Sequence, residues 1–365
     1  MGSELLNIIR GLSELKNTDF SESGVQIPVC TIGFFDGVHR GHASLVKDLS
    51  RWAQQLGGTP MVITFANHPK EITLGHAPAM LTPVSTRLQQ LEELGIEWVI
   101  LLEFDEDLAS WSAERFVDEV IQECVQCRHL LMGFDSAFGQ GARGTFDYLQ
   151  QLNLADLELR SSPPLLVEGE AVSSSAVRSC LQEGDLRRVT LMLDRPYSLS
   201  GPVITGDQRG RTIGFPTANL DPGKVLVPPV GVYVGRAILL EEDGSPGEIW
   251  PTAINIGRRP TFGTPEAPEG TPFDPALDRL EAHLDGFSGD LYGRTLAIEF
   301  HRRLRGSANF HPWTPSSSRS FAMWNRCEIG GAVSTGVPLR SSGDSTRRCR
   351  NDSRPLQKHA GLAPQ

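Results

Sequence analysis

The ten residues from Gly33 to His42 read GFFDGVHRGH, and they stand between a short apolar run and a helical pattern. The run before them is VCTI, at 29–32, where β-branched residues and a small thiol favour a buried strand. Apolar residues recur at helical spacing in residues 42–56, directly after the stretch. A strand-to-helix turn presents backbone N–H groups and a helix N-terminus to anions, so the stretch predicts a phosphate site.

Two imidazoles, those of His39 and His42, stand at the start of the expected helix. Such a pair can donate hydrogen bonds to phosphate oxygens that gain charge when an α-phosphorus is attacked. Gly33, Gly37 and Gly41 would let a phosphate approach the backbone closely. A helix cap with incidental histidines is the alternative for H-x-G-H alone. A zinc pair is less favoured, because metal-binding histidines on one helix face prefer i, i+4 spacing and no third ligand is obvious.

Strand and helix patterns alternate through the first half of the chain. The strand-like runs are 29–32, 61–65, 97–104 and 129–135, and the helical runs are roughly 42–56, 85–94 and 112–127. This alternation predicts a doubly wound, Rossmann-like parallel sheet, in which ligands bind beyond the carboxyl ends of the strands. The GFFDGVHRGH stretch falls at such an end.

The sequence changes character near residue 195, where Gly, Pro and Thr become frequent. Short strand patterns follow at 231–239, 252–257, 279–284 and 295–304. Short strands separated by turn residues suggest an antiparallel barrel or sandwich, and a small β-barrel is our prediction. We therefore expect a first domain at 1–187, a barrel domain at 188–306 and an atypical tail at 307–365.

Length and composition fit a two-domain enzyme. The chain has 365 residues, 39% of them hydrophobic, and a net charge of −10, which argues against general nucleic-acid binding. No apolar run is long enough to span a bilayer and no basic signal region opens the chain, so we expect a cytoplasmic protein without a membrane partner. Cys124 and Cys127 form a C-x-x-C at the carboxyl end of a helical pattern, which favours packing over redox or zinc chemistry. The oligomeric state is not predicted.

A second phosphate-binding element lies in VSSSAVRSCLQEGDL, at 172–186. Ser173, Ser174 and Ser175 stand at a helix start, and Arg178 follows one turn later. Hydroxyls, free N–H groups and a guanidinium together suit a polyphosphate, although a simple capped helix is the alternative. Combined with the two histidines, the element favours nucleotide transfer.

A third element is GDQRGRTIGFPTANL, at 206–220. Its glycines, Gly206, Gly210 and Gly214, permit a tight phosphate-facing loop, and Pro216 stiffens the chain after them. In an extended segment Thr217 and Asn219 lie on the same face, and their oxygens are hard ligands suited to Mg²⁺ beside ATP phosphates. A Gly/Pro turn between two strands is the alternative.

These motifs resemble a known family. TIGFFDGVHRGH with VSSSAVR resembles nucleotidyltransferases that carry H-x-G-H and a serine-rich, arginine-bearing loop. TFANHP (64–69) and MGFDSAFGQGARG (132–144) are similar to the adenylyltransferase half of the bacterial bifunctional riboflavin kinases/FAD synthetases. The glycine pattern ending in PTAN resembles the kinase half, and GVYVG, NIGRRPTFG, LEAHLDGF and GDLYG follow in order. The chain departs from the family pattern at Asn67, where proline is usual, and in FDSAFG.

The resemblance implies two ATP-dependent reactions, phosphorylation of riboflavin to FMN and adenylation of FMN to FAD with release of pyrophosphate. It implies Mg²⁺ as the metal and three roles for residues in each of the two sites. In the adenylyltransferase, these are catalytic His39 and His42, the ATP-binding Gly33, Phe35, Asp36, Gly37, Gly41, Ser174, Ser175 and Arg178, and the flavin or nucleotide wall Asn67, His68 and Asp135. In the kinase, these are the general base Glu281, the ATP-binding Gly206, Gly210, Gly214 and Pro216, and the metal ligands Thr217 and Asn219.

Two other functions stay open at this point. One is a single-activity H-x-G-H adenylyltransferase with an impaired kinase module. The other is a non-catalytic, flavin-binding regulatory protein on the same scaffold.

The tail from 307 onward lacks the long amphipathic helix that the resemblance leads us to expect. It shows no helical period, which predicts disorder. AMWNR, at 322–326, has a possible codon series that encodes Asp-Val-Glu-Gln in another frame. A frameshift near residues 306–315 is therefore one hypothesis, and a genuinely divergent tail is the other.

Overall fold

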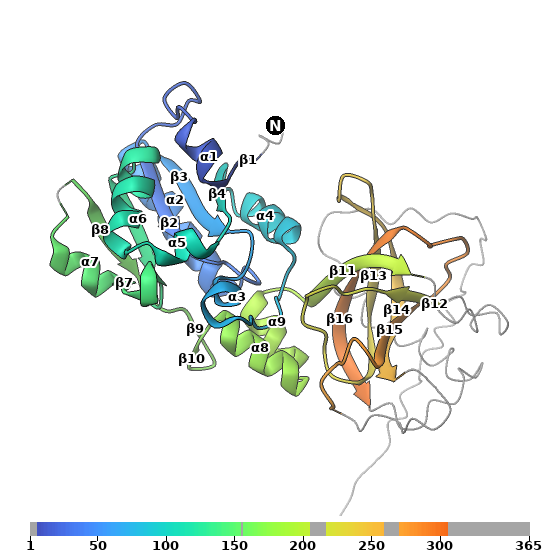
Figure 1. Cartoon of the computed structure of the whole chain (residues 1–365). Coiled ribbons are helices and arrows are strands. Elements are labelled where there is room, and N and C mark those ends of the chain that lie inside the picture. The colour runs from blue at the N-terminus through green and yellow to red at the C-terminus, as the bar shows by residue number, and fades with distance from the viewer. Residues whose placement is uncertain (1–5, 155, 205–216, 259–269, 306–365) are drawn as a thin grey trace, which may run out of the picture. The chain divides into compact units, whose positions relative to one another are not determined.

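The computed structural model describes residues 6–154, 156–204, 217–258 and 270–305. They form an α/β domain followed by a closed antiparallel barrel, which confirms the predicted fold class (Figure 1). The predicted tail at 307–365 lies outside the described residues, as do Gly206, Gly210, Gly214 and Pro216 of the kinase loop.

Six parallel strands make the sheet of the first domain, in the order β1-β4-β3-β2-β5-β8. Their bounds are β1 Asn7–Arg10, β2 Pro28–Ile32, β3 Thr59–Phe65, β4 Trp98–Leu102, β5 His129–Gly133 and β8 Glu158–Ser162. The chain adds strands outward from β2 in one direction and then, from β5, in the other. The order therefore reverses between β2 and β5, and ligands in such sheets bind at this reversal.

Both faces of the sheet are buried, which explains why its strands are continuous apolar runs. Val29, Val62 and Val99 pack on one face, and the next residue of each strand packs on the other. The longer connections are helical: α2 Arg40–Leu56, α4 Val84–Glu93, α8 Ser174–Glu183 and α9 Leu186–Leu193. Short elements complete the domain: α1 Gly11–Lys16, α3 Pro69–Leu74, α5 Glu106–Ser110, α6 Ala113–Phe116, η1 Val117–Cys124, β6 Ala137–Phe138, η2 Gln140–Ala142, β7 Gly144–Thr145, α7 Phe146–Leu152, β9 Leu166–Val167 and β10 Glu170–Ala171.

The barrel closes in the order β11-β12-β15-β14-β13-β16. Its strands are β11 Tyr197–Ile204, β12 Thr217–Leu220, β13 Gly231–Leu240, β14 Pro246–Arg258, β15 Asp278–Leu284 and β16 Thr295–Arg305. Alternate residues of each strand fill the interior, as Leu296, Ile298 and Phe300 of β16 do with no exposed surface. The side chains between them face outward.

One predicted helix differs in type from the sequence expectation, because the run at 112–127 forms α6 continued by the π-helical η1. The edge strand β1 lies in a stretch for which no strand is predicted from the sequence. The predicted boundary at 187/188 falls inside α9, and the barrel begins with β11. Within the described ranges, no helix is both long and apolar enough to cross a membrane.

Candidate active sites

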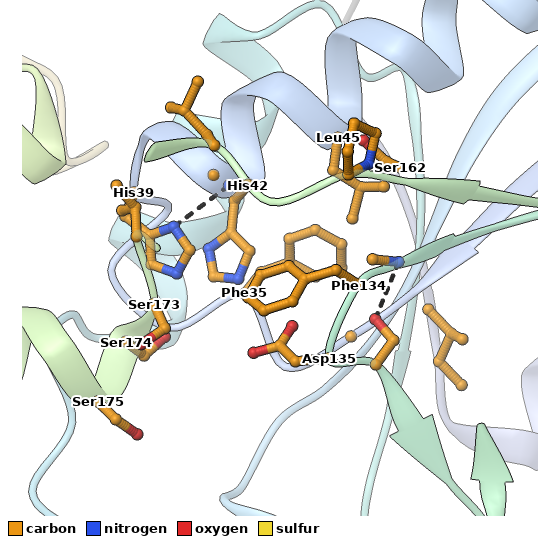
Figure 2. A pocket seen from close by; sticks show the side chains of 18 residues that line it. Phe35, His39, His42, Leu45, Phe134, Asp135, Ser162, Ser173, Ser174 and Ser175 are labelled. Carbon is orange, nitrogen blue, oxygen red and sulfur yellow. Dashed lines mark hydrogen bonds between the residues drawn. The ribbon is translucent and has the colours of Figure 1, made fainter. Parts of the chain in front are cut away.

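The H-x-G-H turn lies where β2 ends and α2 begins, at the carboxyl edge of the sheet. His39 is the N-cap of α2, and its Nδ1 accepts a hydrogen bond of 3.2 Å from the backbone N–H of His42. The two rings stack on each other (Figure 2). Their centroids are 3.6 Å apart, and their planes are 14° apart. The spacing of two histidines three apart at a helix start thus produces one compact imidazole pair.

The two histidines are uncharged at neutral pH. Burial lowers the pKa of His39 to about 3, and the charge of Arg195 lowers it further. Burial also holds the pKa of His42 well below its usual value, with added effects from His39 and from buried Arg87. Since Nδ1 of His39 accepts a hydrogen bond, the proton of the neutral ring is on Nε2. His39 is therefore arranged as a neutral N–H donor.

A pocket opens in front of the stacked rings (Figure 2). Three segments line it, each following the carboxyl end of a strand: β2, β5 or β8. They contribute Ile32, Gly33, Phe35, His39, Gly41, His42 and Leu45; Gly133, Phe134, Asp135 and Ser136; and Ser162, Pro163, Leu165, Val172, Ser173, Ser174 and Ser175. The pocket thus lies at the reversal of strand order between β2 and β5, beyond the carboxyl ends of the strands, which is where ligands bind in sheets of this kind.

Gly41 leaves little space for a side chain. A Cβ there would lie 3.0 Å from the carbonyl oxygen of Val172 and 3.0 Å from Nδ1 of His39. The first turn of α2 therefore packs directly against the backbone that leads into α8. This close approach brings the histidines and the serines to one pocket.

The serine element begins α8 as expected. Ser173 is the N-cap, and its Oγ accepts a hydrogen bond of 3.2 Å from the N–H of Ala176. Ser174 donates to the carbonyl of Asp36 at 2.8 Å, and Ser175 is exposed at the pocket wall. The N-terminus of a ten-residue helix therefore faces the imidazole pair, which suits an anion.

Asp36 and Arg178 form an ion pair outside the lining of the pocket. Asp36 is 2% exposed, and its carboxylate also accepts hydrogen bonds from the N–H groups of Leu81 and Thr82. Burial raises its pKa, against the effect of these N–H groups and of Arg178. Arg178 Nε donates to the carbonyl of Ala79 at 2.9 Å. These hydrogen bonds connect the H-x-G-H turn to residues 79–82.

Asn67 and His68 also lie away from the described pocket wall. The carboxamide of Asn67 makes two 2.8 Å hydrogen bonds with the backbone of Phe104, joining the segments that follow β3 and β4. His68 caps α3, accepting from the N–H of Lys70, and burial lowers its pKa to about 4. Of the three residues predicted for the flavin or nucleotide wall, Asp135 lines the pocket. The roles of all three stay predictions.

The barrel brings a second set of predicted residues together. Asn219 of β12 lies directly opposite Glu281 of β15, which in turn lies opposite Asn255 of β14. Thr217 pairs in the same way with His283. Because Ala218, Leu220, Leu280 and Ala282 fill the interior, the five polar residues belong to the outward face of these three strands. Thr217 and Asn219 share one face, as the extended pattern predicted.

This face has the donors that a magnesium–phosphate site needs. A hydroxyl, a carboxamide oxygen and a carboxylate are hard oxygen ligands, and they stand here on neighbouring strands within two residues of one another. The described residues contain no cluster of three or more His, Cys, Asp or Glu side chains able to hold a metal. Thr217, Asn219 and Glu281 fit Mg²⁺ better than a softer transition metal.

Sequence reasoning missed several residues that matter at the first site. Phe134, Ser136, Ser162 and Pro163 line the pocket but were not among the predicted site residues. Phe134 and Ser136 lie within the MGFDSAFGQGARG stretch, whereas Ser162 ends β8 and Pro163 follows it, and neither belongs to a motif. Arg87 is 1% exposed, although it occurs in a helix whose sequence is largely polar. The burial of a single arginine is set by tertiary contacts, so no local signal could have found it.

The comparisons with known proteins agree with this arrangement. The FAD synthetase family matches residues 23–176, and the riboflavin kinase family matches residues 193–314. The bifunctional riboflavin kinase/FMN adenylyltransferase of Bacillus subtilis is 34% identical over 78% of this chain and 86% of its own length. The enzyme of that name from Escherichia coli is 33% identical over 84% of this chain and 91% of its own.

A solved structure has the same fold. The crystal structure titled as a macrolide-efflux protein from Streptococcus pneumoniae aligns with a TM-score of 0.67 and 25% identity, over 86% of this chain and 97% of that one. Two family matches in sequence order, and relatives that cover most of the chain, decide the assignment. The chain belongs to the family of bifunctional riboflavin kinases/FMN adenylyltransferases.

Proposed function

We propose that the chain makes FAD from riboflavin in two ATP-dependent transfers. The barrel domain phosphorylates riboflavin to FMN, and the α/β domain adenylates FMN, releasing pyrophosphate. The observation that carries the proposal is the presence of both sites: an imidazole pair facing a helix N-terminus, and Glu281 paired in register with Asn219. Family membership supports both activities.

In the adenylyl transfer, a phosphate oxygen of FMN attacks the α-phosphorus of ATP, and the bond to pyrophosphate breaks. We propose that Nε2–H of His39, together with His42, donates to the α-phosphate oxygens as their charge grows. Donors fixed in a pocket before the reaction need no reorganisation when this charge develops. The N-terminus of α8, with Ser174 and Ser175, would hold the departing pyrophosphate.

Arg178 is proposed to add positive charge near the polyphosphate. Its guanidinium is bonded to Asp36 and to the carbonyl of Ala79, so direct contact with a phosphate requires that the ion pair open. Gly33, Phe35 and Gly41 would border the nucleotide, and Asp135 stands on the facing wall. Asp36 and Gly37 would contribute by shaping the turn.

In the phosphoryl transfer, Glu281 is proposed to take the proton from the 5′-hydroxyl of riboflavin as this oxygen attacks the γ-phosphorus of ATP. Thr217 and Asn219 would hold Mg²⁺, which neutralises charge on the phosphates when bound. The pairing of Asn219 with Glu281 across β12 and β15 supports this, because the proposed roles need these two residues to be neighbours on one face. We expect both reactions to take place in the cytoplasm.

One assay tests the whole proposal. Purified chain is incubated with riboflavin, ATP and Mg²⁺, and the flavins are separated by chromatography. FMN followed by FAD is the expected result. FAD from supplied FMN, but no FMN from riboflavin, would support the single-activity adenylyltransferase instead. Flavin binding without any product would support the non-catalytic protein.

A further inference from the structure

The turn that carries the two histidines is held in an unusual backbone conformation. Phe35 has φ of 56°, Gly37 has 80° and Val38 has 34°. Positive φ is costly for a residue with a side chain, above all for a β-branched one such as Val38. Such conformations persist only when surrounding contacts hold them. The relevant contacts are those to the carbonyl oxygens of the turn.

Donors from four other segments reach these carbonyls. Phe34 O accepts from Thr64 Oγ1 at 3.1 Å and from Arg87 Nη1 at 2.5 Å. Asp36 O accepts from Ser174, as described above. Gly37 O and Val38 O accept from one guanidinium, that of Arg195, at 2.6 and 3.1 Å.

Arg195 lies between α9 and β11, far from the turn in sequence. Besides its two bonds to the turn, Nη1 donates to Leu193 O at 3.0 Å, at the end of α9. Its planar fork therefore fixes the left-handed part of the turn to the end of a helix. Lysine, with a single ammonium, cannot reproduce this geometry.

Arg195 does not line the described pocket. It acts on the site through the residue that follows Val38, which is His39, the cap of α2 and the first imidazole. A shift of Val38 would move the stacked rings relative to the serines of α8. Misplacement of about 1 Å can cost on the order of 10²-fold in rate, even from a residue remote from the chemistry.

We propose that Arg195 is a positioning residue for adenylyl transfer, which holds the H-x-G-H turn through Gly37 O and Val38 O without touching the substrates. The inference rests on the proposed function of this pocket. A purely structural role of Arg195 would lower both activities when the residue is replaced. A positioning role should lower the turnover of adenylyl transfer and leave riboflavin phosphorylation by the same chain intact.

The test compares Arg195→Met, Arg195→Lys and Arg195→Ala with Arg188→Met as the matched control. Arg188 lies on α9 but pairs with Glu170 at the surface. For FAD formation from FMN, we expect kcat of Arg195→Met to fall about 10- to 100-fold, with a smaller change in KM for ATP and FMN. Arg195→Lys should recover part of the loss. FMN formation from riboflavin should stay at the unmodified rate in all four variants.

Rescue of Arg195→Ala by guanidinium separates positioning from general damage. Guanidinium chloride at tens of millimolar should restore much of the lost kcat, whereas an equal concentration of sodium chloride should not. Unchanged FAD formation in Arg195→Met, or a parallel loss of both reactions in every Arg195 variant without rescue, would overturn the proposal. If the unmodified chain makes no FAD, the proposed function fails instead, and the two failures are thereby distinguished.

Discussion

His39 illustrates how one residue is tuned by its position rather than by its type. It caps a helix, stacks on a second imidazole and lies near the buried charge of Arg195. Two charged rings with centroids 3.6 Å apart would repel each other strongly, and burial disfavours even one charge. This arrangement supports the proposal that neutral imidazole acts as the hydrogen-bond donor, and neither His39 nor His42 should titrate near pH 7 in the free enzyme.

The free energy of unfolding at acid pH should depend on this neutral state of His39. Between pH 6.5 and pH 3, the unfolded chain protonates His39 but the folded chain does not, so folding stability is lost as the pH falls. The free energy of unfolding should decrease by up to about 1.4 kcal/mol per pH unit from this group. His39→Gln should show a shallower decline in urea titrations at pH 7 and pH 4.5. If the free energy of unfolding falls equally with pH in His39→Gln and in exposed His76→Gln, His39 is protonated in the folded state and the prediction is wrong.

His42→Ala should separate the two activities. Removing one donor to the transition state should lower the rate of FAD formation from FMN by on the order of 10²–10³-fold. FMN formation from riboflavin should continue, because the barrel residues proposed for that step share no ligand with the H-x-G-H pocket. His76→Ala, an exposed histidine, serves as the control. A variant that still makes FAD but no longer makes FMN would reverse the assignment of sites.

At the scale of secondary-structure elements, the sequence predicted the features that depend on local patterns. β2, β3 and β5 were predicted within two residues because buried parallel strands are continuous apolar runs. β1 was missed, since four residues with polar ends carry too little periodicity to predict a strand. The imidazole pair and the serines of α8 were found because their motifs are local. Arg87, Arg195 and the backbone bonds of Asn67 were not, because distant segments create them.

The register of β12 with β15 predicts the effect of Asn219→Ala. Loss of the carboxamide should remove one proposed metal ligand beside Glu281, so FMN formation should fall sharply. Raising the Mg²⁺ concentration should restore part of the rate, since the damage is to metal binding. FAD formation from supplied FMN is the internal control. FMN formation at the unmodified rate would show that Asn219 is not a metal ligand but only a strand residue of β12.

At the scale of the whole molecule, the two sites come from separate stretches of chain. Residues 32–175 line the first pocket, and residues 217–283 supply the polar face of the barrel. FMN formed in one domain is the substrate of the other, but nothing in the described lining requires the two reactions to share a residue. Each activity should therefore be removable without the other.

A stop codon after Gly306 tests this separation and the role of the tail. The shortened chain keeps β16, which ends at Arg305 and closes the barrel by pairing with β11 and β13. It should adenylate supplied FMN at the rate of the full chain, because every residue lining the first pocket lies before residue 176. The sequence from 307 does not show the helical pattern of the segment expected to shield the flavin. Riboflavin phosphorylation should therefore be weak in both chains, and limited proteolysis should trim the full chain to about residue 306. Strong FMN formation by the full chain that truncation abolishes would contradict this, and the divergent tail would then be a working part of the kinase site.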